Sequence, residues 1–137
     1  MTGVQTCALP ISDTCWDQLE KLHPGDEFAQ LGTWFRQMAD HVADYDQRGC
    51  ALANAAIELP EKTHPARRVI EEYKSAVRSR LVRLAQTAGL REPDMLADEL
   101  HLLLEGARVT AQSVGSSGLG ARLIRMGEAV IASHVAA

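Results

Sequence analysis

The segment from 93 to 114 constrains the fold more than any other part of the chain, because it sets a narrow polar stripe on an otherwise apolar background. Its polar side chains recur at steps of four and three residues: Asp94, Asp98, His101, Glu105, Arg108 and Gln112. At about 100° per residue these positions fall on one side of an α-helix. The apolar arc that remains is roughly twice as wide as the arc of about 100° that a single core-facing side requires. Such a helix must be buried on more than one side.

The rest of the chain follows the same helical period. Apolar residues recur every three or four positions from 27 to 45 and again from 65 to 88. The two series are Phe28, Leu31, Phe35, Met38, Val42 and Tyr45, and then Val69, Tyr73, Val77, Leu81, Leu84 and Ala88. Further helices are predicted around Trp16, in the small-residue segment 49–59, and from 118 to 134. Because no segment alternates with period two over the length of a strand, the sequence predicts an all-α fold, an antiparallel bundle of five to six helices.

Local signals mark where these helices begin and end. Asp26 is suited to cap the helix that follows it, and Pro65 and Pro93 are suited to a first helical turn. Gly89 is a stop signal.

The first twelve residues, MTGVQTCALPIS, carry no charge and share no pattern with the rest of the chain. They lack the charged start and the long apolar run of a secretory signal. Back-translated from a GTG start, the stretch resembles a sequencing-library adapter that ends at the first base of the Ser12 codon. Residues 1–12 are therefore expected to be an adapter-derived or disordered extension, and residues 13–137 to form the domain, with the upstream part of the gene missing.

Composition narrows the function classes. A chain of 137 residues with a net charge of −4 fits a single domain and is not typical of a nucleic-acid binder. Outside the extension, the two cysteines Cys15 and Cys50 have no C-x-x-C partner, which favours a reducing cytoplasm without disulfides. No apolar run approaches the roughly 20 residues of a membrane span, so no membrane association is expected.

Two patterns could indicate phosphate or metal binding, but each has a simpler structural interpretation. The basic residues between 65 and 88 could contact phosphates, but pairs such as Arg67–Glu71 and Arg68–Glu72 favour a solvated face. Asp98, His101 and Glu105 share a helix face, yet the chain lacks two helices with the Glu-x-x-His motif of a di-metal bundle. We therefore expect no metal, no cofactor and no catalytic residues. One alternative stays open: the chain could be a stand-alone helical-bundle protein, and such a protein could be a metal-dependent enzyme.

Three segments resemble the C-terminal domain of TetR-type transcriptional regulators: RGCALANAAIELP, HPARRVIEEYKSAVRSRL and LADELHLLLEGARVTAQ. Their order and spacing match as well, and the resemblance covers roughly residues 26–134. It implies a domain that binds a small-molecule effector and forms a homodimer through its last two long helices. It also implies an N-terminal helix-turn-helix domain that reads operator DNA. That domain is missing here, so DNA binding is expected of the parent protein alone.

The resemblance and the wide apolar arc converge on one dimer interface. It would be built by 93–114 and 118–134 of each chain, and small residues would let the helices cross closely. The candidate interface residues are Leu96, Leu100, Leu103, Gly106, Ala107, Ala111, Leu119, Leu123, Met126 and Val130. A charged substitution, Ala107→Arg, is expected to separate the two chains.

A mostly apolar pocket with a few polar groups is typical of small-molecule sites. The candidate lining residues are Trp34, Met38, His41, Asn54, Tyr73 and Leu103. Each of them also fits a core position with a satisfied hydrogen bond. The sequence leaves the identity of the effector open.

Overall fold

The computed structural model describes residues 13–45, 51–59 and 61–137, and these residues form six α-helices without a strand. The helices are α2 (Asp13–Leu22), α3 (Glu27–Tyr45), α4 (Ala51–Glu58), α5 (Pro65–Thr87), α6 (Pro93–Val114) and α7 (Leu119–Ser133). The predicted all-α class is confirmed, and the predicted boundaries of the long helices agree to within one residue. Residues 1–12, which are predicted to be an extension, lie outside the described residues, as do Cys50 and Pro60.

The predicted capping residues act at the helix ends. Asp26 Oδ1 accepts a hydrogen bond from the Ala29 amide at 3.0 Å and so caps α3. His64 Nδ1 accepts from the Ala66 amide at 3.2 Å, and Pro65 occupies the first turn of α5. Gly89 takes a φ of +72°, which a residue with a side chain adopts only under strain, and the chain turns there into α6.

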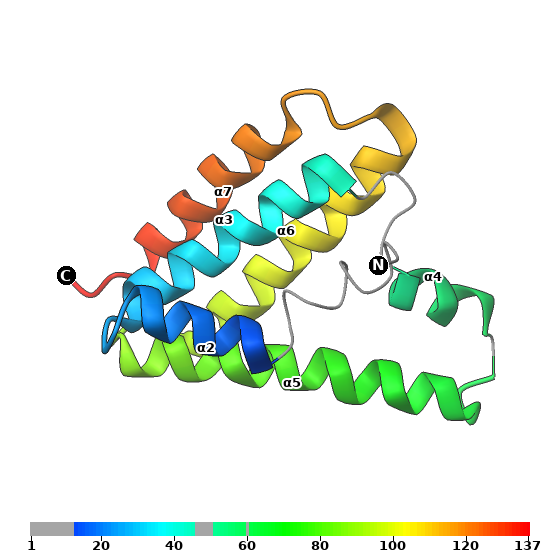
Figure 1. Cartoon of the computed structure of the whole chain (residues 1–137), viewed down its shortest axis with the longest axis horizontal. Helices are drawn as coiled ribbons and strands as arrows, with labels where there is room; N and C mark the ends of the chain where they lie inside the picture. The colour runs from blue at the N-terminus through cyan, green and yellow to red at the C-terminus, as the bar shows by residue number, and fades with distance from the viewer. Residues whose placement is uncertain (1–12, 46–50, 60) are drawn as a thin grey trace.

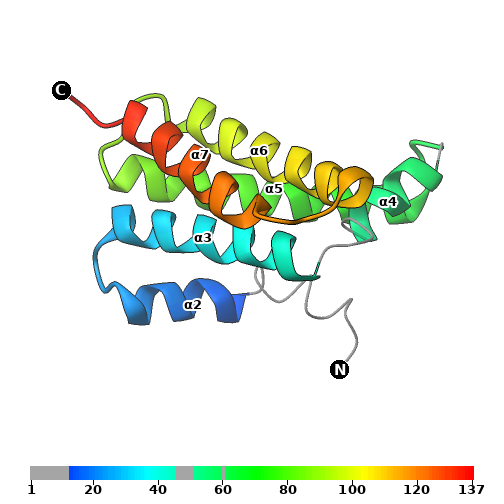
Figure 2. The ribbon, with the colours of Figure 1, turned by 90° about the horizontal axis from the view of Figure 1, so that it is seen from above.

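Helices α3, α6 and α7 lie side by side, and α5 crosses beneath them (Figure 1). Helix α2 folds back along α3, on the side away from α6 (Figure 2). Helix α4 lies apart from this group, beside the N-terminal half of α5. The core fills the space between α2, α3, α5, α6 and α7, and its largest fully buried side chains are Trp34, Phe35, Leu19, Leu31, Met38, Leu81, Leu96, Leu100 and Val42.

The contact between α3 and α7 depends on two small residues. A Cβ atom placed on Gly127 would lie 2.0 Å from Cε1 of Phe35, and one placed on Gly120 would lie 3.1 Å from Cβ of Ala43. The phenyl ring of Phe35 therefore rests directly against the backbone of α7. Neither glycine was predicted from the sequence to lie at a helix contact.

The wide apolar arc of α6 is mostly covered within the chain. Helices α3 and α7 pack on its apolar sides, while α5 packs along its polar stripe. Helix α2 packs on α3. Two residues of the predicted apolar faces are exposed: Phe28 in the first turn of α3 and Val69 in the second turn of α5.

Candidate functional site

A long apolar groove runs between α6 and α7 on the outer surface. Its hollow measures about 650 Å³. The two helices are antiparallel, and the turn at 115–118 joins them at one end of the groove. The lining residues are Glu99, Leu102, Leu103, Gly106, Ala107, Thr110, Leu119, Arg122, Leu123, Met126 and Val130.

The outer edge of the groove exposes large apolar side chains. Leu102 is 69% exposed and Met126 is 52% exposed. Met95 and Val109 extend the line of Leu102 along α6 at intervals of seven residues, and both are exposed as well. A Cβ atom on Gly106 would meet no atom within 4 Å, so this glycine faces open space. An apolar strip of this kind is typical of an interaction surface.

Most of the predicted dimer residues line this groove. They are Leu103, Gly106, Ala107, Leu119, Leu123, Met126 and Val130. The other three, Leu96, Leu100 and Ala111, are buried in the chain's own core, so that part of the prediction is corrected. The prediction fails for these three residues because the wide arc of α6 comprises two faces, an inner face toward α3 and an outer strip.

The polar stripe of α6 forms ion pairs with basic residues of α5. Arg78 holds Asp98 with two hydrogen bonds of 2.6 and 3.0 Å and reaches Asp94 at 3.4 Å. The hydrogen bond from Arg78 is the main reason why the pKa of Asp98 lies below its usual value. The polar stripe therefore forms the contact between α5 and α6, and both carboxylate oxygens of Asp98 are bound by Arg78.

Glu105 lies at the centre of a partly buried cluster. It accepts hydrogen bonds from Lys74 at 2.8 Å and from Arg108 at 2.6 Å, and His101 lies 4.0 Å away. Burial raises the pKa of Glu105, but the hydrogen bond from Lys74 and the positive charges of Lys74 and Arg108 outweigh it, so the pKa is lowered. Burial and the positive charge of Lys74 lower the pKa of His101. The carboxylate of Glu105 is thus the shared anion that joins α5 to α6.

Replacing Glu105 with glutamine is expected to destabilise the chain by about 1–2 kcal/mol, because Lys74 and Arg108 then face each other without the carboxylate. The lowered pKa gives a stabilising contribution that is present above the ordinary glutamate pKa and is lost as the pH falls through the folded value. Urea unfolding at pH 3–7 measures it: the difference between wild type and Glu105→Gln should shrink toward acid. A constant difference would contradict this account.

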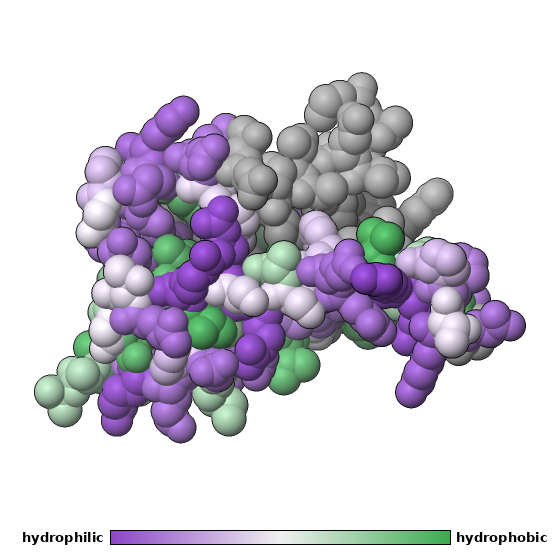
Figure 3. All heavy atoms as spheres, turned by 90° about the horizontal axis from the view of Figure 1, so that it is seen from below, coloured by the Kyte–Doolittle hydropathy of each residue, from purple (hydrophilic) through white to green (hydrophobic). Residues whose placement is uncertain are grey.

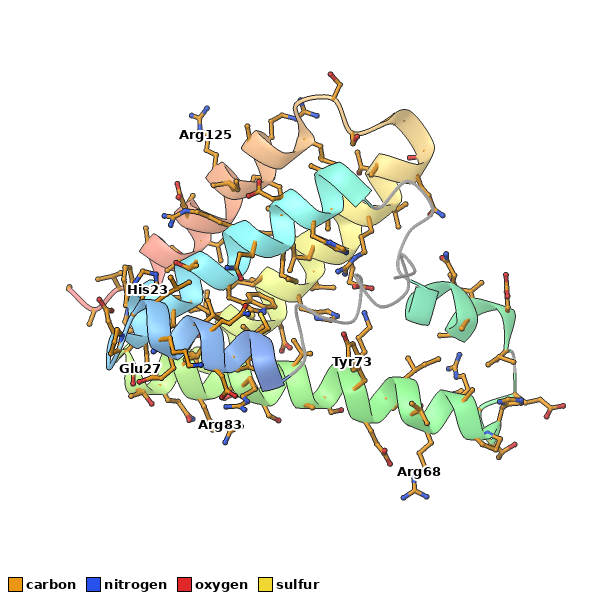
Figure 4. All side chains as sticks on the ribbon, in the orientation of Figure 1. His23, Glu27, Arg68, Tyr73, Arg83 and Arg125 are labelled. Carbon is orange, nitrogen blue, oxygen red and sulfur yellow. The ribbon has the colours of Figure 1, made fainter. Side chains whose placement is uncertain are left out.

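The candidate effector residues occupy two separate regions. Trp34 and Met38 belong to the core. Tyr73 packs against that core from α5. Its side chain points toward the bundle, whereas the side chain of Arg68 on the same helix points away from it (Figure 4). His41 is buried on α3, and Asn54 is half-buried on α4. Leu103, in contrast, lines the outer groove. The six candidate residues therefore do not gather in one site, because Leu103 lies apart from the other five.

A second hollow of about 310 Å³ lies where α2, α3 and α5 meet. Trp16 stacks on Trp34 with ring centroids 6.0 Å apart, and the guanidinium of Arg80 lies 5.6 Å from the centroid of Trp16. Charged residues of both signs line this hollow, among them Glu20, Glu27, Arg80 and Arg83. Sequence reasoning missed this arrangement, because it joins residues from three helices without a common spacing.

The remaining basic residues of α5 have two roles. Arg68 pairs with Glu72 at 2.9 Å, as predicted for a solvated face. Arg67 instead donates to the main-chain carbonyls of Ala56 and Leu59 at the end of α4, so the predicted pairing with Glu71 is corrected. A cation at a helix C-terminus is favourable there. Seen from below, the surface along α5 is mostly hydrophilic (Figure 3).

Comparison with protein-family models, curated proteins and solved structures found no match to this chain. Among the residues that the structure describes, no three His, Cys, Asp or Glu side chains gather as metal ligands. Within the same residues, no helix combines the length and apolar character needed to cross a membrane. Function has to be inferred from the geometry itself.

Proposed function

We propose that this chain is the effector-binding and dimerisation domain of a TetR-type transcriptional regulator, and that it acts in the cytoplasm. A small molecule bound inside the bundle changes the affinity of the whole protein for operator DNA. The DNA is contacted by a helix-turn-helix domain that is not part of this sequence.

The apolar groove between α6 and α7 is the observation that carries the proposal. The family resemblance names the last two long helices as the dimer interface, and these two helices border the 650 Å³ groove. A second copy of the chain is the simplest occupant, because a two-fold axis brings the same apolar strip to both sides of the interface. Burying side chains such as Leu102 and Met126 contributes roughly 1.5–3 kcal/mol for each fully buried residue.

The effector half of the proposal is supported by Trp34. Its indole is 1% exposed, and no acceptor among the described residues pairs with Nε1. A buried donor without an acceptor costs about 1–3 kcal/mol. A small molecule that presents an oxygen to this nitrogen would remove that cost. We therefore propose Trp34 as the polar contact of a mostly apolar effector.

Sedimentation of the native chain tests the association directly. At micromolar concentration we expect a single species of twice the 14.9 kDa chain mass. The expected mass should persist at high salt, since apolar contacts carry the interface. A monomer under these conditions would contradict the dimer and, with it, the main support for the proposed function.

A further inference from the structure

The C-terminal end of α7 is fastened to the turn between α5 and α6 by three hydrogen bonds. The main-chain amide of Arg91 donates to the carbonyl of His134 at 2.8 Å, and the Arg91 guanidinium donates to the carbonyl of Ser133 at 2.8 Å. In return, Nδ1 of His134 lies 2.7 Å from the carbonyl oxygen of Arg91. These contacts close the bundle, because they join residues that lie 42 or 43 positions apart in the sequence.

The second ring nitrogen of His134 has a partner of the same kind. Nε2 lies 2.8 Å from Oε2 of Glu99 on α6, and the imidazole is only 6% exposed. A main-chain carbonyl and a carboxylate both accept hydrogen bonds and have no hydrogen to donate. A neutral imidazole has one N–H group, so it would turn a lone pair toward one of these oxygens. Only the doubly protonated ring satisfies both contacts.

We propose that His134 is a proton-operated latch on the bundle. With two protons it holds the end of α7 to Glu99 of α6 and to Arg91 of the turn; the loss of one proton removes one of these two contacts and so favours opening of that end. The latch lies at one end of the α6–α7 groove, because Glu99 is itself a lining residue.

The charges around the ring agree with this state. Burial lowers the pKa of His134, but the hydrogen bonds to Arg91 and Glu99 and the negative charges of Glu99 and Glu92 raise it, and the raising effects prevail. On the other side of α7, Glu128 forms an ion pair with Arg36 of α3, and Glu128 lies six residues before His134.

The direction of the pH effect follows from the raised pKa. The closed latch binds its second proton more tightly than the open one does. It is therefore fully closed below the pKa of the open state, and opening grows as the pH rises through the interval between the two pKa values. Within that interval the opening equilibrium changes about tenfold per pH unit.

Nitrogen-detected NMR of the native chain tests the proton count. We expect both ring nitrogens of His134 to carry a proton at mildly acidic pH, and one of them to lose it only above the pH at which an ordinary histidine does. Hydrogen exchange of the last amides of α7, corrected for intrinsic rates, should show opening that increases about tenfold per pH unit over the same range. A ring that loses its second proton at or below the pH of an ordinary histidine would overturn the proposal.

Three variants separate the latch from a general effect of pH. His134→Gln should abolish the pH dependence of exchange at the end of α7. His23→Gln is the matched control and should preserve it, since His23 contacts the Thr33 hydroxyl, which can donate as well as accept. Glu99→Gln should lower the pKa of His134 and keep the end of α7 protected at high pH, because an amide can donate to the neutral ring. Unchanged pH dependence in His134→Gln would contradict the latch.

The latch itself requires no second chain, so these measurements stand if the native chain proves monomeric. An effect on association rests on the proposed function: opening of the latch should then weaken the dimer at high pH in wild type and leave Glu99→Gln unaffected. A dimer whose strength does not follow the titration of His134 would confine the latch to the single chain.

Discussion

Gly127→Ala is expected to lower the stability of the chain by about 2 kcal/mol, even though alanine is the better helix former by about 1 kcal/mol. The new methyl group would lie 2.0–2.5 Å from three atoms of the Phe35 ring. That ring is fully buried between α3 and the rest of the core, so it cannot move aside without displacing its neighbours. Overpacking of this kind typically costs about 1–3 kcal/mol and lowers the melting temperature by several degrees.

The chain supplies a matched control for this substitution. Gly32 also lies in the middle of a helix, and a Cβ atom there meets nothing within 4 Å. Gly32→Ala should therefore raise the melting temperature while Gly127→Ala lowers it, as measured by calorimetry. If both substitutions raised it, α7 would not lie against the Phe35 ring. Phe35→Leu should recover part of the loss in the Gly127→Ala background, because a smaller side chain leaves room for the methyl group.

The contrast among these glycines shows which features could be predicted from the sequence and which could not. Helical spacing predicted α3, α5, α6 and α7 closely, because an apolar face is a local property of the chain. The need for a small residue is not local, since it depends on which side chain of another helix lies opposite. From the sequence, Gly106 was therefore expected to allow close packing between two copies, and within one chain it faces open space; Gly127, which touches a ring of the same chain, had no such signal.

The same limit applies to the polar residues. The stripe on α6 was recognised, but its partners are Lys74 and Arg78 on α5, 31 and 20 residues away from Glu105 and Asp98. A usable signal was present: an acidic stripe on α6 follows a basic stripe on α5, and consecutive antiparallel helices bring such stripes together. The contact of His134 with Arg91 and Glu99 had no comparable signal, because a single histidine after the last helix fits many environments.

Leu102→Arg is expected to separate the proposed dimer. The side chain is 69% exposed in the single chain, so the substitution should change the stability of the monomer by less than about 0.5 kcal/mol. In the dimer it would place an unpaired charge in an apolar interface once per chain, and each such charge costs about 3–5 kcal/mol. The dissociation constant should rise on the order of a thousandfold or more, as measured by sedimentation across a concentration series. Val69→Arg is the matched control, because Val69 is 61% exposed but lies on α5, and it should leave the dimer intact.

Gly106→Arg distinguishes loss of association from loss of folding more sharply. Ala107, which the sequence alone favoured for this test, is 6% exposed within one chain, so an arginine there would also damage the core. Gly106 points into the open groove, and an arginine there improves helix propensity by up to about 1 kcal/mol. The expected result is therefore a chain that is more stable as a monomer and no longer dimeric. Because the two effects have opposite signs, unfolding cannot produce both of them. A Gly106→Arg chain that remained dimeric would show that the groove between α6 and α7 is not where two copies meet.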